Sequence, residues 1–315
     1  MTSLLSSPGR LDYIECLFVS DAALPRPSAI PGSAVHSVES ALSHIAARLD
    51  RGLSHWLVVA VNEHPDLSLA DSPHFCVKRL LREARRRWGK AVTLIADVGL
   101  SPYQSSGQSV IQAEGTIDVE ASYAAAADLA CHFAEAGADA VAPCLSLPQQ
   151  TAAIRQALDL QGLSAGLIPY STKFSSSLYG PYRQAIGSRL GLMRKAYQFD
   201  YDDAGLALDQ LEHDIAQGAE ATIVKPALPY LDVLAEACRR SSRPVAVYHV
   251  SGEYCMAVLA AQAGLLDLDD YLAEIHAAFR RCGARWVIGY AAEAFLAAAE
   301  SQSPAESQNC AESQI

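Results

Sequence analysis

The sequence lacks any long apolar run, and this absence excludes one broad class of protein. No segment of the 315 residues approaches the roughly 20 consecutive apolar residues that a helix needs to cross a bilayer. The opening segment, MTSLLSSPGR, also lacks the hydrophobic core of a secretory signal peptide. We therefore expect no membrane partner and a cytoplasmic location.

Positive charge and paired cysteines are also scarce. Lysine and arginine number 24 against 35 acidic residues, so the net charge is -11, which argues against nucleic acid as a partner. The basic stretch at residues 78–90 (KRLLREARRRWGK) has the spacing of a solvated helix face. The 8 cysteines form no CxxC pair and mostly lie in apolar segments, as reduced core cysteines do.

Short apolar runs alternate with helix-like segments along most of the chain. This alternation is the pattern of repeated βα units, which favours a parallel sheet. Strands are predicted at residues 13–19, 57–61, 92–97, 138–143, 166–170, 221–225, 245–250 and 286–290. Helices are predicted at residues 37–51, 73–88, 120–136, 149–161, 204–217, 230–240, 255–263 and 268–281.

Eight strands with eight helices predict a (β/α)8 TIM barrel, an α/β fold. A doubly wound sheet is the competing architecture, but no GxGxxG follows the first strand. We expect a short N-terminal arm at residues 1–10 and a barrel catalytic domain at residues 11–299. Residues 300–315 repeat Ala-Glu-Ser-Gln and related units, which predicts a disordered polar tail.

Two lysines at the ends of apolar runs are the strongest functional signal. Lys225 closes the run at residues 221–224, and Lys173 follows the run at residues 167–170. In a TIM barrel the active site lies at the C-terminal ends of the strands. Burial there favours a neutral amine, the form that condenses with a ketone to give a Schiff base. Other polar side chains at predicted strand ends are Asp97, Tyr248, Ser251 and Tyr290.

Each of these residues has a structural alternative. A strand-end lysine can reach solvent, Asp97 can cap a loop, and Tyr248 and Tyr290 can be core aromatic residues with a satisfied hydroxyl. His249 follows Tyr248, and strand alternation directs it to the other face. We expect His249 to be structural and not catalytic.

Four long motifs occur at residues 97–103 (DVGLSPY), 173–183 (KFSSSLYGPYR), 224–232 (VKPALPYLD) and 247–254 (VYHVSGEY). In this order they resemble the motifs of porphobilinogen synthase, also called 5-aminolevulinate dehydratase, and the resemblance runs from about residue 11 to residue 298. It implies a lyase (hydro-lyase) of tetrapyrrole and haem biosynthesis. Such an enzyme joins two molecules of 5-aminolevulinate into the pyrrole porphobilinogen with loss of two waters.

The resemblance implies that Lys225 forms a Schiff base with the substrate that supplies the propionate side of the product. Tyr248, Ser251 and Tyr290 match the residues around that substrate, and the last two would hold its carboxylate.

The resemblance also implies that Lys173 binds the second substrate, which supplies the acetate side. Asp97 matches an aspartate near the amino group of that substrate. Arg183, Arg194 and Gln198 match lid residues that would bind its carboxylate, a task that suits the guanidinium fork.

The chain departs from the family where zinc-using members carry three cysteines and other members place aspartates. The matching positions are Gly99, Ser101 and Ser109, and a nearby histidine position is Ser106. Glycine offers no side-chain ligand and a neutral serine is a poor ligand for Zn²⁺. We therefore expect no catalytic zinc and no other cofactor, and the sequence leaves a remote activating Mg²⁺ site open.

A second departure follows the fourth predicted strand. Family members usually have Ala-Pro-Ser-Asp-Met-Met-Asp, and residues 142–148 of this chain read APCLSLP. Cys144 replaces a substrate-contacting serine and Leu145 replaces an aspartate. Loss of the carboxylate is expected to weaken binding of an ammonium-bearing second substrate.

Three hypotheses follow from these features, and a metal-independent porphobilinogen synthase is the favoured one. Cys144 and Leu145 favour instead a divergent paralogue in secondary metabolism that uses 5-aminolevulinate or a related amino ketone for another product. A catalytically silent binding or regulatory homologue is disfavoured because both lysines, the lid arginines and the tyrosine pair are kept. Only about ten residues precede the first strand, so we expect a homo-oligomer, and the short segment supports a dimer better than the family's octamer.

Overall fold

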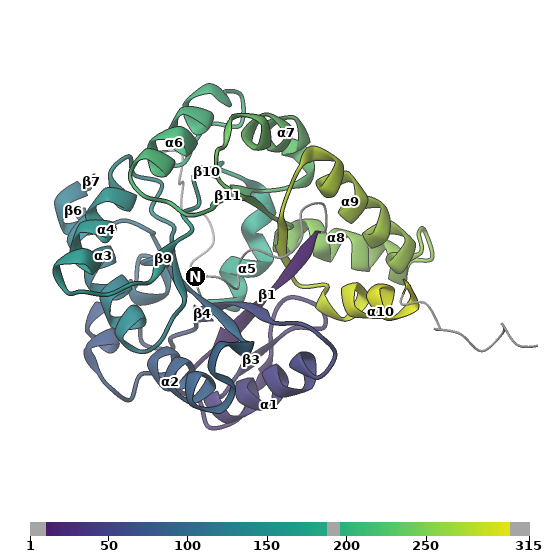
Figure 1. Cartoon of the computed structure of the whole chain (residues 1–315), viewed down its shortest axis with the longest axis horizontal. Helices are drawn as coiled ribbons and strands as arrows, with labels where there is room; N and C mark the ends of the chain where they lie inside the picture. Colours follow the sequence, from purple (N-terminus) through teal and green to yellow (C-terminus); the bar gives the residue numbers. More distant parts are fainter. Residues whose placement is uncertain (1–10, 188–195, 303–315) are drawn as a thin grey trace, which may run out of the picture.

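The computed structural model describes residues 11–187 and 196–302. Its main sheet is a curled parallel ring in the order β10-β11-β12-β13-β1-β4-β5-β8-β9, surrounded by helices (Figure 1). The barrel strands are β1 (Asp12–Val19), β4 (His55–Ala60), β5 (Thr93–Val98), β8 (Ala140–Pro143), β9 (Gly166–Leu167), β10 (Thr172–Lys173), β11 (Thr222–Lys225), β12 (Val245–Tyr248) and β13 (Trp286–Gly289). The predicted TIM barrel is confirmed.

The fifth strand of the barrel differs from the prediction of one strand at residues 166–170. In the structure, β9 pairs with β8 and β10 pairs with β11, and irregular backbone separates β9 from β10. Proline has no N–H to donate to a ladder, and Pro169 lies in this break. Tyr170 N donates to Pro143 O (2.9 Å) and Ile223 N donates to Pro169 O (2.9 Å). The broken strand therefore still closes the ring through bonds to both neighbours.

The outer layer contains the predicted helices and two others. The predicted ones are α1 (Val38–Leu49), α2 (Cys76–Trp88), α3 (Val119–Glu135), α4 (Gln150–Leu160), α6 (Gly205–Ala216), α7 (Leu231–Arg240), α8 (Ser251–Gln262) and α9 (Leu268–Cys282). Helix α8 begins at Ser251 rather than at residue 255, and α5 (Gly180–Ala185) and α10 (Ala292–Gln302) are additional. Short strands β2 (Arg26–Pro27), β3 (Ala34–His36), β6 (Gln112–Ala113) and β7 (Thr116–Ile117) complete the described chain. None of the described helices is long and apolar enough to span a membrane.

The side chains of strand β1 point alternately to the barrel interior and to the helix layer. Cys16 and Phe18 face the interior, where Phe18 stacks on Tyr290 with ring centroids 6.2 Å apart. The intervening Glu15 faces α1 and accepts a hydrogen bond from Trp56 Nε1 (3.1 Å). Because side chains alternate along a strand, residues 16 and 18 belong to the site side and residue 15 to the scaffold side.

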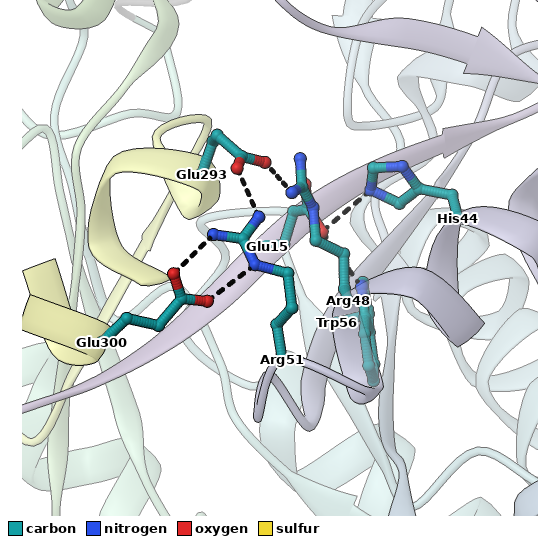
Figure 2. A network of polar contacts seen from close by, with 7 residues as sticks. All are labelled: Glu15, His44, Arg48, Arg51, Trp56, Glu293 and Glu300. Atoms are coloured by element: carbon teal, nitrogen blue, oxygen red, sulfur yellow. Dashed lines mark hydrogen bonds and ion pairs between the residues drawn. The ribbon is translucent and has the colours of Figure 1, made fainter. Parts of the chain in front are cut away.

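Helix α10 is joined to α1 by a network of ion pairs (Figure 2). Arg48 of α1 and Arg51 just after it both pair with Glu293, and Arg51 Nε also lies 2.8 Å from Glu300 Oε1. Among the described residues, the last helix is therefore attached to the first. Helix α10 continues past the predicted domain boundary at residue 299 and is described as far as Gln302. The predicted arm at residues 1–10 and the rest of the predicted tail lie outside the described residues.

Candidate active site

The two lysines predicted from the sequence lie side by side at one end of the barrel. Strands β10 and β11 are parallel, and Lys173 is the register partner of Lys225. Equivalent positions on adjacent strands direct their side chains to the same face. Both side chains are buried, with 3% and 5% exposure. Neighbouring strand ends thus bring two amines into one small volume.

The Lys225 amine lies among four tyrosine rings. Its Nζ is 4.0 Å from the ring centroid of Tyr248 and 4.8 Å from that of Tyr170. The rings of Tyr182 and Tyr179 follow at 5.1 and 5.4 Å. Aromatic faces attract a cation, but they also remove water from around it.

The pKa of Lys225 is lowered from 10.5 to about 8. Burial is the largest cause, the charge of Cys144 opposes it, and the neighbouring charge of Lys173 adds to it. At pH 7 about one amine in ten is then neutral, against roughly one in 2,500 for an unperturbed lysine. Lys225 is therefore suited to attack a ketone near neutral pH.

Lys173 is held by Cys144, which directly follows β8. The Lys173 Nζ donates to the Cys144 carbonyl oxygen and to Cys144 Sγ, both at 2.9 Å. The position at which the family usually has serine thus faces the second lysine. Leu145 is buried in the hydrophobic core, and its N–H donates to Gln150 Oε1 (2.9 Å). Gln150, the first residue of α4, therefore holds the loop that contains Leu145.

Asp97, near the end of β5, belongs to the same group of residues. It accepts a hydrogen bond from the Tyr170 hydroxyl (2.9 Å), and Tyr170 also contacts Lys225. Burial raises the pKa of Asp97, and the positive charge of Lys225 opposes that rise. The structure therefore brings Asp97 together with both lysines through Tyr170.

Tyr248 and Tyr290 come from adjacent strand ends, and their hydroxyl oxygens lie 2.9 Å apart. The Tyr248 hydroxyl also donates to Cys16 Sγ on β1 (3.2 Å). Burial raises the pKa of Cys16 to about 12, so it stays a neutral thiol. Cys16 was predicted only as a core cysteine, and the alternation of β1 is the signal that could have placed it in the site.

Ser251, the first residue of α8, accepts a hydrogen bond from the Tyr182 N–H (3.0 Å). Tyr179 and Tyr182 were not predicted as site residues, although they belong to the motif at residues 173–183. Tyr170 was missed as well. The rings of all three tyrosines surround the Lys225 amine in the structure. The motif at residues 173–183 therefore contributes two tyrosines to the site in addition to its lysine and arginine.

The predicted lid residues are placed in part. Arg183 lies on α5, with its guanidinium carbon 5.7 Å from the Tyr179 ring centroid. Gln198 is buried, and neither its Oε1 nor its Nε2 has a hydrogen-bond partner among the described residues. Arg194 lies outside the described residues. The role of all three in binding a carboxylate stays a prediction.

The side chains at the positions that match the family's zinc ligands do not fit zinc. A Cβ added to Gly99 would lie 2.9 Å from Asp97 Oδ2, so even a larger residue there would have to displace its neighbours. Ser101 and Ser109 are buried neutral hydroxyls, and Ser106 Oγ accepts the Gln108 N–H (3.2 Å). Within residues 11–187 and 196–302, no group of three or more His, Cys, Asp and Glu side chains could hold a metal ion.

His249 lies on the opposite face from Tyr248, as alternation predicts. It packs beside Phe279 of α9 with ring centroids 6.2 Å apart. Burial lowers the pKa of His249 to about 3, so its ring is neutral. This environment suits a structural residue of the layer between sheet and helices.

A closed βα barrel with buried polar side chains gathered at its strand ends defines a TIM-barrel enzyme. A sequence model of one family of such enzymes, described as "Delta-aminolevulinic acid dehydratase", matches residues 9–298. The chain therefore belongs to the delta-aminolevulinic acid dehydratase family, a family of hydro-lyases.

Individual relatives agree with this assignment. The chain is 34% identical to the delta-aminolevulinic acid dehydratase of Streptomyces coelicolor over 287 residues, which cover 89% of this chain and 87% of that protein. It is 35% identical to the Mycobacterium tuberculosis enzyme over 282 residues, with 87% and 86% covered. A solved structure of the Toxoplasma gondii enzyme in complex with porphobilinogen aligns with a TM-score of 0.88 and 32% identity, covering 98% of this chain and 90% of that one. The predicted family, fold and lyase class are confirmed.

Proposed function

We propose that this enzyme condenses two molecules of 5-aminolevulinate to porphobilinogen through Schiff bases on Lys225 and Lys173, without a catalytic zinc. In this reaction one carbon–carbon and one carbon–nitrogen bond form between the substrates, and two ketone oxygens leave as water. The observation that carries the proposal is the pairing of the two lysines in the β10–β11 register. Two amines at adjacent strand ends can hold two ketones in contact. A condensation needs this, because bringing two free molecules together costs entropy.

The surroundings of Lys225 support its role as the lysine of the first substrate. Its amine is largely desolvated, and its pKa of about 8 leaves a useful neutral fraction. Burial raises the pKa values of Tyr248 and Tyr290 well above 10, so both hydroxyls keep their protons. Tyr248 would turn its hydroxyl from Cys16 to donate a hydrogen bond to the oxygen that leaves as the Schiff base forms. Ser251 and Tyr290 would bind the carboxylate of this substrate.

The surroundings of Lys173 support its role as the lysine that binds the second substrate. Its amine is oriented by two hydrogen bonds to Cys144 and lies beside the first amine. Asp97, whose pKa is raised by burial, would exchange a proton with the amino group of the second substrate. Arg183, Arg194 and Gln198 would bind its carboxylate, and the buried amide of Gln198, which has no hydrogen-bond partner among the described residues, offers it a donor.

The test is an assay in the presence of a chelator. Purified protein is incubated with 5-aminolevulinate and EDTA, and porphobilinogen is measured with a pyrrole-reactive aldehyde reagent. We expect product despite the chelator. A strict requirement for added zinc would contradict the reading of Gly99, Ser101 and Ser109 as a site without metal ligands.

Borohydride trapping tests the two Schiff bases. Reduction during turnover should fix substrate on Lys225 and Lys173, and the yield on Lys225 should rise with pH towards a plateau above about pH 8. Lys225→Met and Lys173→Met should each lower product formation by more than about a hundredfold. Lys90→Met, which changes an exposed lysine, is the matched control and should leave both adducts intact. Absence of any adduct would refute Schiff-base catalysis.

A second candidate function is favoured by Cys144 and Leu145. Cys144 contacts Lys173, and neither it nor the following Leu145 carries a carboxylate, so the second site suits a partner other than an ammonium-bearing 5-aminolevulinate molecule. This paralogue would trap 5-aminolevulinate on Lys225 but form no porphobilinogen from it alone. Related amino ketones, supplied together with 5-aminolevulinate, would then give a different product.

A further inference from the structure

Cys144 and Lys173 form a contact between two nucleophiles that the proposed condensation does not require. Cys144 Sγ lies 2.9 Å from Lys173 Nζ, and the Cys144 carbonyl oxygen holds the same amine at 2.9 Å. Cys144 is 7% exposed and Lys173 is 3% exposed. Two hydrogen bonds therefore hold the amine against the sulfur, away from bulk solvent.

No other described cysteine has this arrangement. Cys16 Sγ accepts a hydrogen bond from a tyrosine hydroxyl, and Cys76 and Cys282 donate weakly to backbone carbonyls. The remaining described cysteines, Cys131, Cys238 and Cys255, have no hydrogen bond from an amine. Within the described residues, only Cys144 has a side-chain nitrogen in contact with its sulfur.

The contact itself favours reaction between the two groups. Lys173 Nζ lies 2.9 Å from Cys144 Sγ, so an amine is already in contact with the sulfur when a peroxide oxidises it to a sulfenic acid. Cys16 Sγ, by contrast, accepts a hydrogen bond from the Tyr248 hydroxyl.

We propose that a hydroperoxide converts Cys144 and Lys173 into a reversible sulfenamide cross-link, a redox switch on the second lysine. In the first step the Cys144 thiol reacts with ROOH to give Cys144–SOH and ROH; sulfur is oxidised and the O–O bond breaks. In the second step the lone pair of Lys173 Nζ attacks the sulfur. The S–N bond forms, the S–O bond breaks, and the hydroxyl group leaves with an amine proton as water.

A thiol reductant reverses the link. The thiol RSH attacks the sulfur, the S–N bond breaks, and Lys173 recovers its amine while Cys144 carries a mixed disulfide. A second RSH then releases the Cys144 thiol and RSSR. Because Lys173 would have no free amine in the linked state, the switch would stop the condensation. That consequence rests on the proposed function, whereas formation of the link does not.

Peptide mapping tests the link directly. The full-length protein is treated with hydrogen peroxide, quenched with catalase, alkylated, digested and analysed by mass spectrometry. We expect a peptide pair joined through Cys144 and Lys173 that has lost two hydrogen atoms, and we expect dithiothreitol to abolish it. In Lys173→Met, Cys144 should stop at the sulfenic acid, which dimedone captures. Cys144→Ser should give no link, whereas the control Cys238→Ser should give the wild-type link.

Several results would overturn the proposal. One is a disulfide at Cys144 that accounts for the loss of two hydrogen atoms. Another is stable oxidation of Cys144 in the wild type without a link to Lys173. The third is a Cys144 that stays unreacted while other cysteines are oxidised. The activity of each variant is compared with its own untreated sample. Peroxide should remove most wild-type activity reversibly and should spare Cys144→Ser. If untreated protein makes no porphobilinogen, the proposed function fails while the mapping still decides the link.

Discussion

At the residue scale, burial of Lys225 makes its amine more suitable for catalysis but lowers the stability of the fold. The same burial that provides a neutral amine lowers the pKa of Lys225 from 10.5 to about 8. Below pH 8 the folded protein must hold a buried ammonium that the unfolded chain holds in water. Each pKa unit corresponds to about 1.36 kcal/mol, so the difference amounts to about 3 kcal/mol.

Lys225→Met is therefore expected to raise the free energy of unfolding at pH 7 by up to about 3 kcal/mol while abolishing the adduct at residue 225. Methionine fills a similar volume without a charge. Since the folded pKa lies below the unfolded one, the wild-type deficit is complete below pH 8 and disappears as the pH rises towards 10.5. Urea unfolding of both proteins at pH 7 and pH 10 measures this. An equal gain at both pH values, or none at pH 7, would contradict the assignment.

At the scale of elements, Glu253 connects helix α8 to the loop that follows Lys225. This buried carboxylate accepts three backbone N–H groups: Ala227 (3.2 Å) and Leu228 (2.6 Å) from the loop, and Val250 (2.6 Å) from the start of α8. Burial nevertheless raises the pKa of Glu253 to about 7. Its titratable neighbours are tyrosines, which stay neutral across this range. One side chain thus fixes both the loop that follows Lys225 and the helix that carries Ser251.

Glu253→Gln should lower the free energy of unfolding by about 1–3 kcal/mol, because an amide has one acceptor oxygen and its NH₂ would face a donor. The variant should also change the pH dependence. The folded pKa of about 7 exceeds the unfolded value of 4.5, so the wild-type contribution is greatest below pH 4.5 and is lost as the pH rises to about 7. Melting temperatures between pH 5 and pH 8 should therefore slope downward less in the variant. An identical slope would show that Glu253 does not titrate there.

Helix α8 also approaches the 3-10 segment η5 (Ser177–Tyr179) closely, and Gly252 makes this possible. A Cβ at residue 252 would lie 2.5 Å from the Leu178 carbonyl oxygen. Gly252→Ala should therefore push η5 and its Tyr179 away from Lys225, and lower stability by about 1–3 kcal/mol. Gly180→Ala is the control, because nothing lies within 4 Å of its added Cβ. Thermal unfolding and the Lys225 adduct yield should fall in the first variant only; equal effects would contradict the packing argument.

At the scale of the whole molecule, the sequence predicted the barrel and its lysines because both depend on local patterns. Short apolar runs mark the strands, and a lysine at the end of such a run lies at the catalytic end of any TIM barrel. The division of the fifth strand was missed because the apolar run at residues 166–170 hides the effect of Pro169, which interrupts the ladder. Helix α5 was missed because its six residues show no full period of apolar side chains.

The site lining was harder to predict, because it depends on which distant residues meet. Cys16 contacts Tyr248 only because β1, β13 and β12 are successive neighbours in the closed ring. Tyr170 reaches both Asp97 and Lys225 from a backbone break that no periodic pattern reveals. The contact between Cys144 and Lys173 likewise joins the ends of β8 and β10. Which of these residues contact each other depends on the register between strands that are far apart in the sequence. Residue type alone does not predict it.

The connection between the two ends of the barrel chain gives a prediction for the whole molecule. Arg48 of α1 and Arg51 just after it hold Glu293 and Glu300 of α10 (Figure 2), while Phe295 of α10 packs on β1 with its ring 5.0 Å from that of Tyr13. The ion pairs are exposed to solvent, so they should contribute little to the free energy of unfolding and should weaken with salt. Their effect should be local to α10, since the apolar contacts under it remain.

The double variant Arg48→Gln/Arg51→Gln should therefore speed hydrogen exchange of the α10 amides severalfold and leave the exchange of β11 and β12 unchanged. Wild-type protein in 1 M salt, where the Debye length is about 3 Å, should show the same change. Arg86→Gln is the matched control, because Arg86 pairs only within α2, with Glu83 three residues away. Unchanged exchange in α10 would show that the apolar packing of Phe295 holds the helix without the ion pairs. Faster exchange in the barrel strands as well would show that closing the two chain ends stabilises the whole sheet and, through it, the register that pairs Lys173 with Lys225.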